Sequence, residues 1–233
     1  MTGGQLSRAD IGSRKEIDMV LPKNRQRARS DSEKEARRDA ILKAAQRLIG
    51  RVGIDGMTMN ALAAEAGVSK GTLYIYFSSK EELLLALFVD AMAQVVAIIE
   101  AEANADTLIE VMGRAPTEAP LFVPLLARLV AVIEANVPDN SLFAEKRKMR
   151  DMGQRVATVI AQVTGAPEHK AREASMALML TMQGAAQFDI SARRDLSSVP
   201  EDMRPMFEGQ SFCKSFPAAA RLILSGVTSD GRA

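Results

Sequence analysis

Residues 58–80 combine several hydroxyl donors with two lysines, and the spacing of these groups predicts a shared helix face. Lys70 and Tyr74 lie four residues apart, so on a helix they occupy neighbouring positions of one side. Leu73 and Phe77 have the same spacing and are expected to anchor another side to a core. Ammonium and hydroxyl groups are donors of the kind that contact phosphates and base edges of nucleic acids.

Two short helices joined by a tight turn are the elements that would position this face. Leu62, Ala63 and Ala66 give the first helix an apolar side. Gly67 can take the left-handed conformation that ends this helix, and Ser69 is a good N-cap for the next one. The pattern predicts a helix-turn-helix, a motif whose second helix enters the major groove of DNA.

The string AxxAGVSKGTLYxYFxSKEEL, which spans residues 63–83, resembles the DNA-binding segment of the TetR/AcrR family of bacterial transcriptional regulators. A bare helix-turn-helix pattern is shared by many core helix pairs. The Tyr-x-Tyr-Phe-x-x-Lys exit makes this resemblance more specific. It covers roughly residues 33–90, and beyond them only length and helical character are similar.

The resemblance implies roles for individual side chains of the motif. Lys70, Gly71 and Thr72 would lie against base edges, where Lys donates to guanine and a Thr methyl meets a thymine methyl. Tyr74 and Tyr76 would donate to phosphates, although Tyr76 also fits a half-buried aromatic. The expected DNA-contacting set is Thr58, Asn60, Ser69, Lys70, Gly71, Thr72, Tyr74, Tyr76 and Lys80.

Charge is distributed unevenly along the chain. The 233 residues carry a net charge of only +1, so the whole molecule is not a general polyanion binder. Residues 23–51, however, contain ten Lys and Arg but only four Asp and Glu, which indicates one basic end directed at phosphate. Lys23, Arg25, Arg27 and Arg29 either extend that surface to DNA as an arm or form a solubilising tail.

Few residues suit catalysis or metal binding. Cys213 is the only cysteine and His169 the only histidine, so neither a His/Cys metal cluster nor a Ser-His-Asp or Cys-His pair is expected. We therefore expect no enzyme activity, no metal and no cofactor. A single thiol and a polar start without a signal peptide suit the cytoplasm. No run approaches the ~20 apolar residues of a membrane span, so no membrane partner is expected.

The periodicity predicts an all-α fold in three parts. These are a flexible basic arm (1–31), a three-helix helix-turn-helix domain (32–79) and a larger helical effector-binding and dimerisation domain (80–233). Ser32 and Ser79 would each begin a helix through a capping box. A break is expected around Gly113, Pro116 and Pro120. One apolar helix over 121–137, which Pro124 can kink, and a last helix over 213–225 are expected after it.

The larger domain is expected to hold an adaptable apolar pocket, because thirteen methionines are many for this length and Met repacks easily around ligands. Ordinary core is the alternative for each Met. The expected pocket residues are Phe88, Met92, Phe122, Leu126, Phe143, Met149, Met152 and Met179. The resemblance further implies a homodimer formed through the last two helices. Small or apolar residues there could form its contacts, namely Met176, Leu180, Gly184 and Leu222, and the alternative is that they fill the core of a monomer.

These features suggest a repressor that binds a palindromic operator as a dimer and is released by a small apolar or amphipathic effector. An activator, or a regulator whose ligand is a corepressor, would share the same features. An architectural DNA-binding protein without a ligand is less consistent, since about 140 residues lie beyond the DNA-binding segment. The effector, the operator and the sign of regulation do not follow from the residues.

Overall fold

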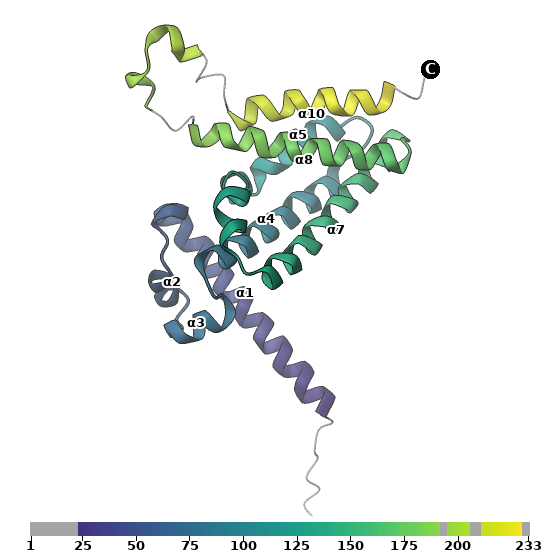
Figure 1. The fold of residues 1–233 in the computed structure, drawn as a ribbon. Coiled ribbons are helices and arrows are strands. Elements are labelled where there is room, and N and C mark those ends of the chain that lie inside the picture. Colours follow the sequence, from purple (N-terminus) through teal and green to yellow (C-terminus); the bar gives the residue numbers. More distant parts are fainter. Residues whose placement is uncertain (1–22, 192–194, 206–210, 230–233) are drawn as a thin grey trace, which may run out of the picture. The chain divides into compact units, whose positions relative to one another are not determined.

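A computed structural model describes residues 23–191, 195–205 and 211–229, and all its regular elements are helical (Figure 1). The expected all-α class is thereby confirmed. The chain divides into two compact units after Asp39. Residues 1–22 of the expected arm lie outside the described residues, as do the side chains of residues 23–31.

Helix α1 (Lys23–Gly56) begins nine residues before Ser32, so the helix start predicted there is wrong. Ser32 lies inside the helix rather than at its start. Residues 23–31 contain no Gly or Pro and are rich in good helix formers, so no local signal stops the helix there. Near its other end, Gly53 has a φ of 75° and a ψ of 169°, which kinks α1 three residues before Gly56.

The predicted helix-turn-helix consists of α2 (Met59–Glu65) and α3 (Lys70–Tyr76). Gly67 has the expected left-handed φ of 64° in the turn. The Ser69 hydroxyl accepts a hydrogen bond from the Thr72 N–H at 3.0 Å and caps α3 as predicted. Leu62, Leu73 and Phe77 are buried in the core between the helices. Local capping and turn chemistry therefore agree with tertiary packing here.

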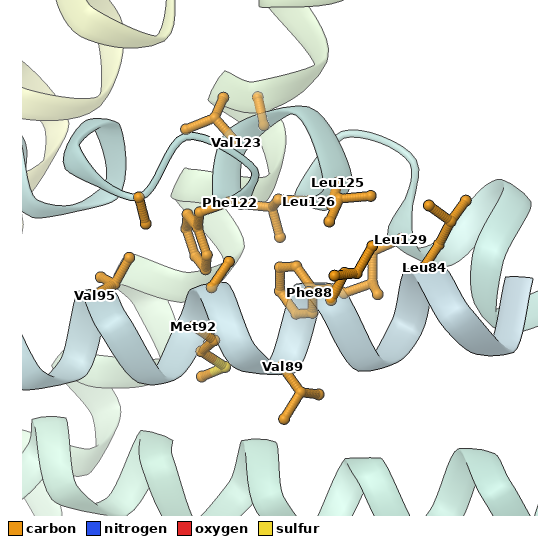
Figure 2. Close-up of a cluster of buried hydrophobic side chains, with 14 of the residues drawn as sticks. Leu84, Phe88, Val89, Met92, Val95, Phe122, Val123, Leu125, Leu126 and Leu129 are labelled. Carbon is orange, nitrogen blue, oxygen red and sulfur yellow. The ribbon is translucent and has the colours of Figure 1, made fainter. Parts of the chain in front are cut away.

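Helix α4 (Lys80–Glu102) begins at the predicted cap, where Ser79 accepts from the Glu82 N–H at 3.0 Å. Among the described residues, it is the one helix long and apolar enough to cross a membrane, which the sequence analysis did not expect. Its most apolar window has a mean hydropathy of 2.1, but 67% of that window is buried inside the molecule. This burial is what a central core helix requires. Figure 2 shows Phe88 of α4 beside Phe122, and their rings stack with centroids 5.4 Å apart.

Helix α5 (Leu108–Glu118) runs through Gly113 and Pro116, so the predicted break is wrong at these two residues, and the chain breaks only around Pro120. The reason is a close approach to α10 (Phe212–Ser229), the last helix of the chain. A Cβ placed on Gly113 would lie only 3.0 Å from the Pro217 Cβ of α10. The glycine thus serves helix packing rather than helix termination.

Residues 121–137 do not form the single helix that was predicted. The segment divides into α6 (Phe122–Leu126), the π-helical turn η1 (Leu129–Ile133) and the 3-10 turn η2 (Glu134–Asn136). Two contacts disturb the helical ladder. The Ala127 carbonyl accepts from the Gln187 side chain at 2.6 Å, and the Arg128 carbonyl accepts from both Val132 and Ile133 at 3.1 Å.

Two long helices, α7 (Asp139–Thr164) and α8 (Glu168–Ser191), complete the body. Gly165, with a φ of 71°, ends α7 and starts the turn between them. Helix α7 packs against α4 and α8, and α8 packs against α10 (Figure 1). The short 3-10 turns η3 (Leu196–Ser198) and η4 (Glu201–Met203) lie in the segment between α8 and α10.

Candidate nucleic-acid interface and cavity

The outer face of α3 carries the side chains whose spacing suggested nucleic-acid chemistry. Lys70 and Tyr74 are both exposed, whereas Leu73 between them is buried. The Lys70 ammonium lies 5.9 Å from the centre of the Tyr74 ring, so one side chain supports the position of the other. The Ser69 and Thr72 hydroxyls lie 2.8 Å apart. Donors thus project from one end of a short helix that is anchored from beneath.

Ile75 is a candidate that the sequence analysis missed. It is 74% exposed on α3, in a helix turn that otherwise presents polar groups. Its position four residues after Gly71 and three after Thr72 puts it on their face. A large exposed apolar side chain beside hydroxyl donors suits contact with a thymine methyl. The helical spacing was visible in the sequence, but only polar residues were considered there.

Three of the expected DNA-contacting residues also make contacts within the chain, namely Tyr76, Lys80 and Thr58. Tyr76 is half-buried and packs against the core, which was the alternative considered for it. The Lys80 ammonium lies 3.5 Å from the Asp55 carbonyl oxygen. The Thr58 hydroxyl accepts from the Ala61 N–H at 3.2 Å and caps α2, while Asn60 is exposed. These residues position the helices as well as facing outward.

An ion-pair cluster holds α1 to α2 on the surface. Arg47 Nε lies 3.2 Å from a Glu65 carboxylate oxygen, and Arg51 donates to both oxygens of that carboxylate. The hydrogen bond from Arg51 lowers the pKa of the Glu65 carboxyl, with Arg47 adding to the effect. Because both arginines are solvent-exposed and Glu65 is only half-buried, the cluster mainly fixes geometry.

A cavity of about 420 Å³ lies among α4, η1, α7 and α8. This volume falls within the range of ~300–1,000 Å³ typical of small-molecule sites. Four predicted pocket residues line it, namely Phe88, Met92, Met149 and Met179. The other four do not: Phe122, Leu126 and Met152 are buried in the core, and Phe143 is exposed on α7. Figure 2 shows Phe122 across α4 from Met92.

A second hollow of about 620 Å³ lies against α5 and α10. Four of its lining residues are charged, namely Asp106, Glu110, Arg114 and Arg221. An apolar effector is therefore better matched to the smaller cavity beside α4.

Two polar contacts connect the helix-turn-helix region to the body. Arg128, 15% exposed, donates to the Asp55 carboxylate at 3.0 Å and to the Pro124 carbonyl at 3.0 Å. Glu82 of α4 accepts from the Ser78 N–H at 2.7 Å and from the Ser141 hydroxyl of α7 at 2.7 Å. Neither contact was expected, because both join residues 59 or more positions apart in sequence.

The expected dimer contacts lie on the outer faces of α8 and α10. Met176 is 61% exposed, Leu180 63% and Leu222 77%. Gly184 is exposed as well, and a Cβ built there would meet no atom within 4 Å. Within the part of the chain that the structure describes, these apolar side chains remain largely uncovered, as an interface between copies requires, although Met176 also lines the cavity beside α4.

A capped helix-turn-helix with an outward-facing donor set, joined to a helical body with an apolar cavity, defines the class of DNA-binding transcriptional regulators. Comparison with known proteins gives the family. Residues 41–87 match the profile described as bacterial regulatory proteins, tetR family, and residues 83–227 match the tetracyclin repressor-like C-terminal domain. The chain belongs to the TetR family of transcriptional regulators.

Individual relatives resemble only part of this chain. The HTH-type transcriptional regulator BetI of Rhizobium meliloti is 39% identical over 92 residues, covering 36% of this chain and 45% of BetI. The tetracycline repressor protein class D of Escherichia coli is 39% identical over 57 residues, covering 24% of this chain and 26% of that protein. The chain therefore spans less than half the length of these curated relatives.

Solved structures extend the similarity of fold to most of the chain. A TetR transcriptional regulator from Rhodococcus sp. RHA1 covers 82% of this chain and 97% of its own, with 21% identity and a TM-score of 0.54. At 21% identity, this similarity supports a shared fold and no shared function. It agrees with the prediction of an N-terminal helix-turn-helix domain followed by a helical domain.

Proposed function

We propose that this protein is a cytoplasmic, ligand-responsive repressor that binds a palindromic operator as a homodimer and is released by a small effector. One observation carries the proposal. Helix α3, with its exposed donors, is followed after three residues by α4, and Phe88 and Met92 of α4 line the cavity. Only three residues thus separate the helix with the exposed donors from the helix that lines the candidate effector site.

The proposed roles on DNA follow from exposure. Lys70, Gly71 and Thr72 read base edges, with Ile75 adding an apolar contact, and Tyr74 positions the helix on a phosphate. Thr58, Asn60, Ser69, Tyr76 and Lys80 complete the contact surface. A dimer formed through Met176, Leu180, Gly184 and Leu222 holds two α3 helices about one DNA turn apart, ~34–36 Å. A two-fold reader of this kind requires a two-fold symmetric site.

Release follows from linkage between the two sites. An effector that fits the cavity better when the two α3 helices are spread apart shifts the population away from DNA. A preference of ~1–3 kcal/mol changes operator affinity by ~5–150-fold, and operator DNA weakens effector binding by the same factor. An activator would use the same DNA-binding surface and cavity but increase transcription when bound to DNA. In a corepressor-dependent regulator, the ligand would strengthen operator binding instead of weakening it. The name of the tetracycline repressor relative favours repression.

The test begins with DNA selected from a random library by the purified protein. Footprints are expected on a two-fold symmetric site, and apolar or amphipathic compounds are expected to weaken operator binding. Met92→Trp fills the cavity and is expected either to mimic the effector or to abolish the response. Met203→Trp, at an exposed position outside the cavity, is the matched control. Asymmetric sites would overturn the DNA half, and an operator affinity unmoved by every compound would overturn the effector half.

A further inference from the structure

We infer that the cavity beside α4 selects an amphipathic anion, with an apolar chain inside and a carboxylate or phosphate head at the mouth. The inference rests on the proposed function, because it names the chemical class of the proposed effector. It comes from the distribution of charge around the cavity, which differs sharply between its floor and its mouth.

The floor of the cavity is apolar and adaptable. Phe88 and Met92 of α4 meet Leu129 of η1 there, with Met149 and Met179 from the facing helices α7 and α8. Three unbranched thioethers around a phenyl ring adjust readily to a flexible alkyl chain. Gly153 of α7 also lines the cavity, and a Cβ built on it would meet no atom within 4 Å. The missing side chain leaves room for a ligand.

The mouth of the cavity is positively charged. Three of the lining residues, Lys146, Arg150 and Arg172, are exposed cations, in contrast to the buried Phe88 and Met92. With the one acid of the lining, Glu134, they give a net charge of +2. The Lys146 ammonium lies 2.6 Å from Glu134, so these two residues neutralise each other. The two guanidinium groups of Arg150 and Arg172 therefore account for the charge that a ligand would meet.

Neither arginine is committed to a strong partner. Arg150 pairs with its sequence neighbour Asp151 at 2.8 Å, and Arg172 lies 3.5 Å from Glu168. Both acids are exposed and neither lines the cavity. Exposed pairs of this kind are weak, so an anionic head group can replace these partners. Guanidinium groups bind carboxylates and phosphates with two parallel hydrogen bonds, which favours this head group over a neutral one.

Cationic and neutral head groups are less favourable than anionic ones at this mouth. A cationic amphiphile would place its head beside a mouth of net charge +2. A neutral alcohol would gain the apolar floor but not the charge-assisted hydrogen bonds. The ligand class thus follows from the combination of floor and mouth rather than from either part alone.

The experiment titrates the full-length protein, without DNA, with decanoate, decyl phosphate, decanol and decyltrimethylammonium below their micelle concentrations. Calorimetry is expected to show decanoate or decyl phosphate binding at least about tenfold more tightly than decanol. The tighter of the two anions identifies the head group as carboxylate or phosphate. The Arg150→Gln, Arg172→Gln double variant is expected to lose about tenfold for the anions and to retain its decanol affinity. Arg147→Gln, on the same helix but outside the cavity, is the matched control.

The outcomes separate this inference from the proposed function. Equal binding of decanol and the anions, or an equal loss for both in the double variant, would overturn the anionic assignment while leaving an effector site possible. No binding by any of the four compounds would also overturn it. Selective anion binding that leaves operator affinity unchanged would support the anion site and overturn the effector role.

Discussion

On α3, adjacent exposed side chains are expected to serve different purposes, because base edges carry sequence information and phosphates do not. We predict that Lys70→Ala changes the preferred base at one position of each half-site, at a cost of ~1–3 kcal/mol for the cognate base. Tyr74→Phe removes only a hydroxyl and is expected to weaken binding to every DNA sequence by the same ~0.5–1.5 kcal/mol. Binding of each variant to a randomised operator library measures both effects.

Tyr74→Phe is a better test of a phosphate contact than a substitution of Lys80. The Lys80 ammonium lies 3.5 Å from the Asp55 carbonyl, so its removal would also disturb an internal contact. The assignment is reversed if Lys70→Ala leaves the selected site unchanged while Tyr74→Phe alters it.

Coupling between cavity and DNA-binding region is expected to involve the turn η1 in addition to α4. Arg128 immediately precedes η1, and its neighbours Leu129 and Val130 line the cavity. The same Arg128 bonds to Asp55, beside the kink of α1 at Gly53. A π-helical turn is an uncommon arrangement that often marks a functional site. A ligand pressing on Leu129 would thus act directly on the Arg128–Asp55 pair.

We predict that Asp55→Asn reduces the effector-induced change in operator affinity by ~2–30-fold, equivalent to ~0.5–2 kcal/mol of coupling. The affinity of the protein for the effector in the absence of DNA should change less than the effector-induced change in operator affinity, because Asp55 does not line the cavity. Operator titrations with and without effector measure the coupling. Asp202→Asn, on the exposed turn η4, is the control. A full response in Asp55→Asn would assign the coupling to α4 alone.

For the molecule as a whole, the uncovered apolar faces of α8 and α10 predict self-association. Leu180 and Leu222 are large, exposed and carried by two helices that pack against each other. We predict that Leu222→Glu converts the proposed dimer to a monomer, because two copies of the charge would be buried in a two-fold interface. Operator affinity should then fall at least about tenfold, since one α3 helix reads only half of the site.

Sedimentation and operator binding measured on the same samples test this prediction. Met203→Glu places the same charge at an exposed apolar position outside α8 and α10 and should leave both properties unchanged. A wild-type protein that is monomeric at operator-binding concentrations would contradict the prediction, as would a dimeric Leu222→Glu variant.

The helix-turn-helix was readable from the sequence because its determinants are local. The caps at Ser69 and Ser79 act within three residues, and only a residue that tolerates a positive φ suits the turn at Gly67. The alternation of buried Leu73 with exposed Tyr74 likewise follows from helical spacing. A family resemblance carried by the same residues then supplied the expected contacts with DNA.

Tertiary packing decided the rest, because its causes lie far apart in the chain. Gly113 reads locally as a helix breaker, yet it continues α5 because Pro217 of α10 lies against it. The helix predicted over 121–137 is divided where Gln187 of α8 bonds the Ala127 carbonyl. Whether a Met lines a cavity or fills a core depends on the side of the helix that neighbouring helices leave uncovered, so Met92 and Met149 border the cavity and Met152 does not. Local chemistry therefore specified the DNA-binding motif, and only packing between distant helices set the cavity and its charged mouth.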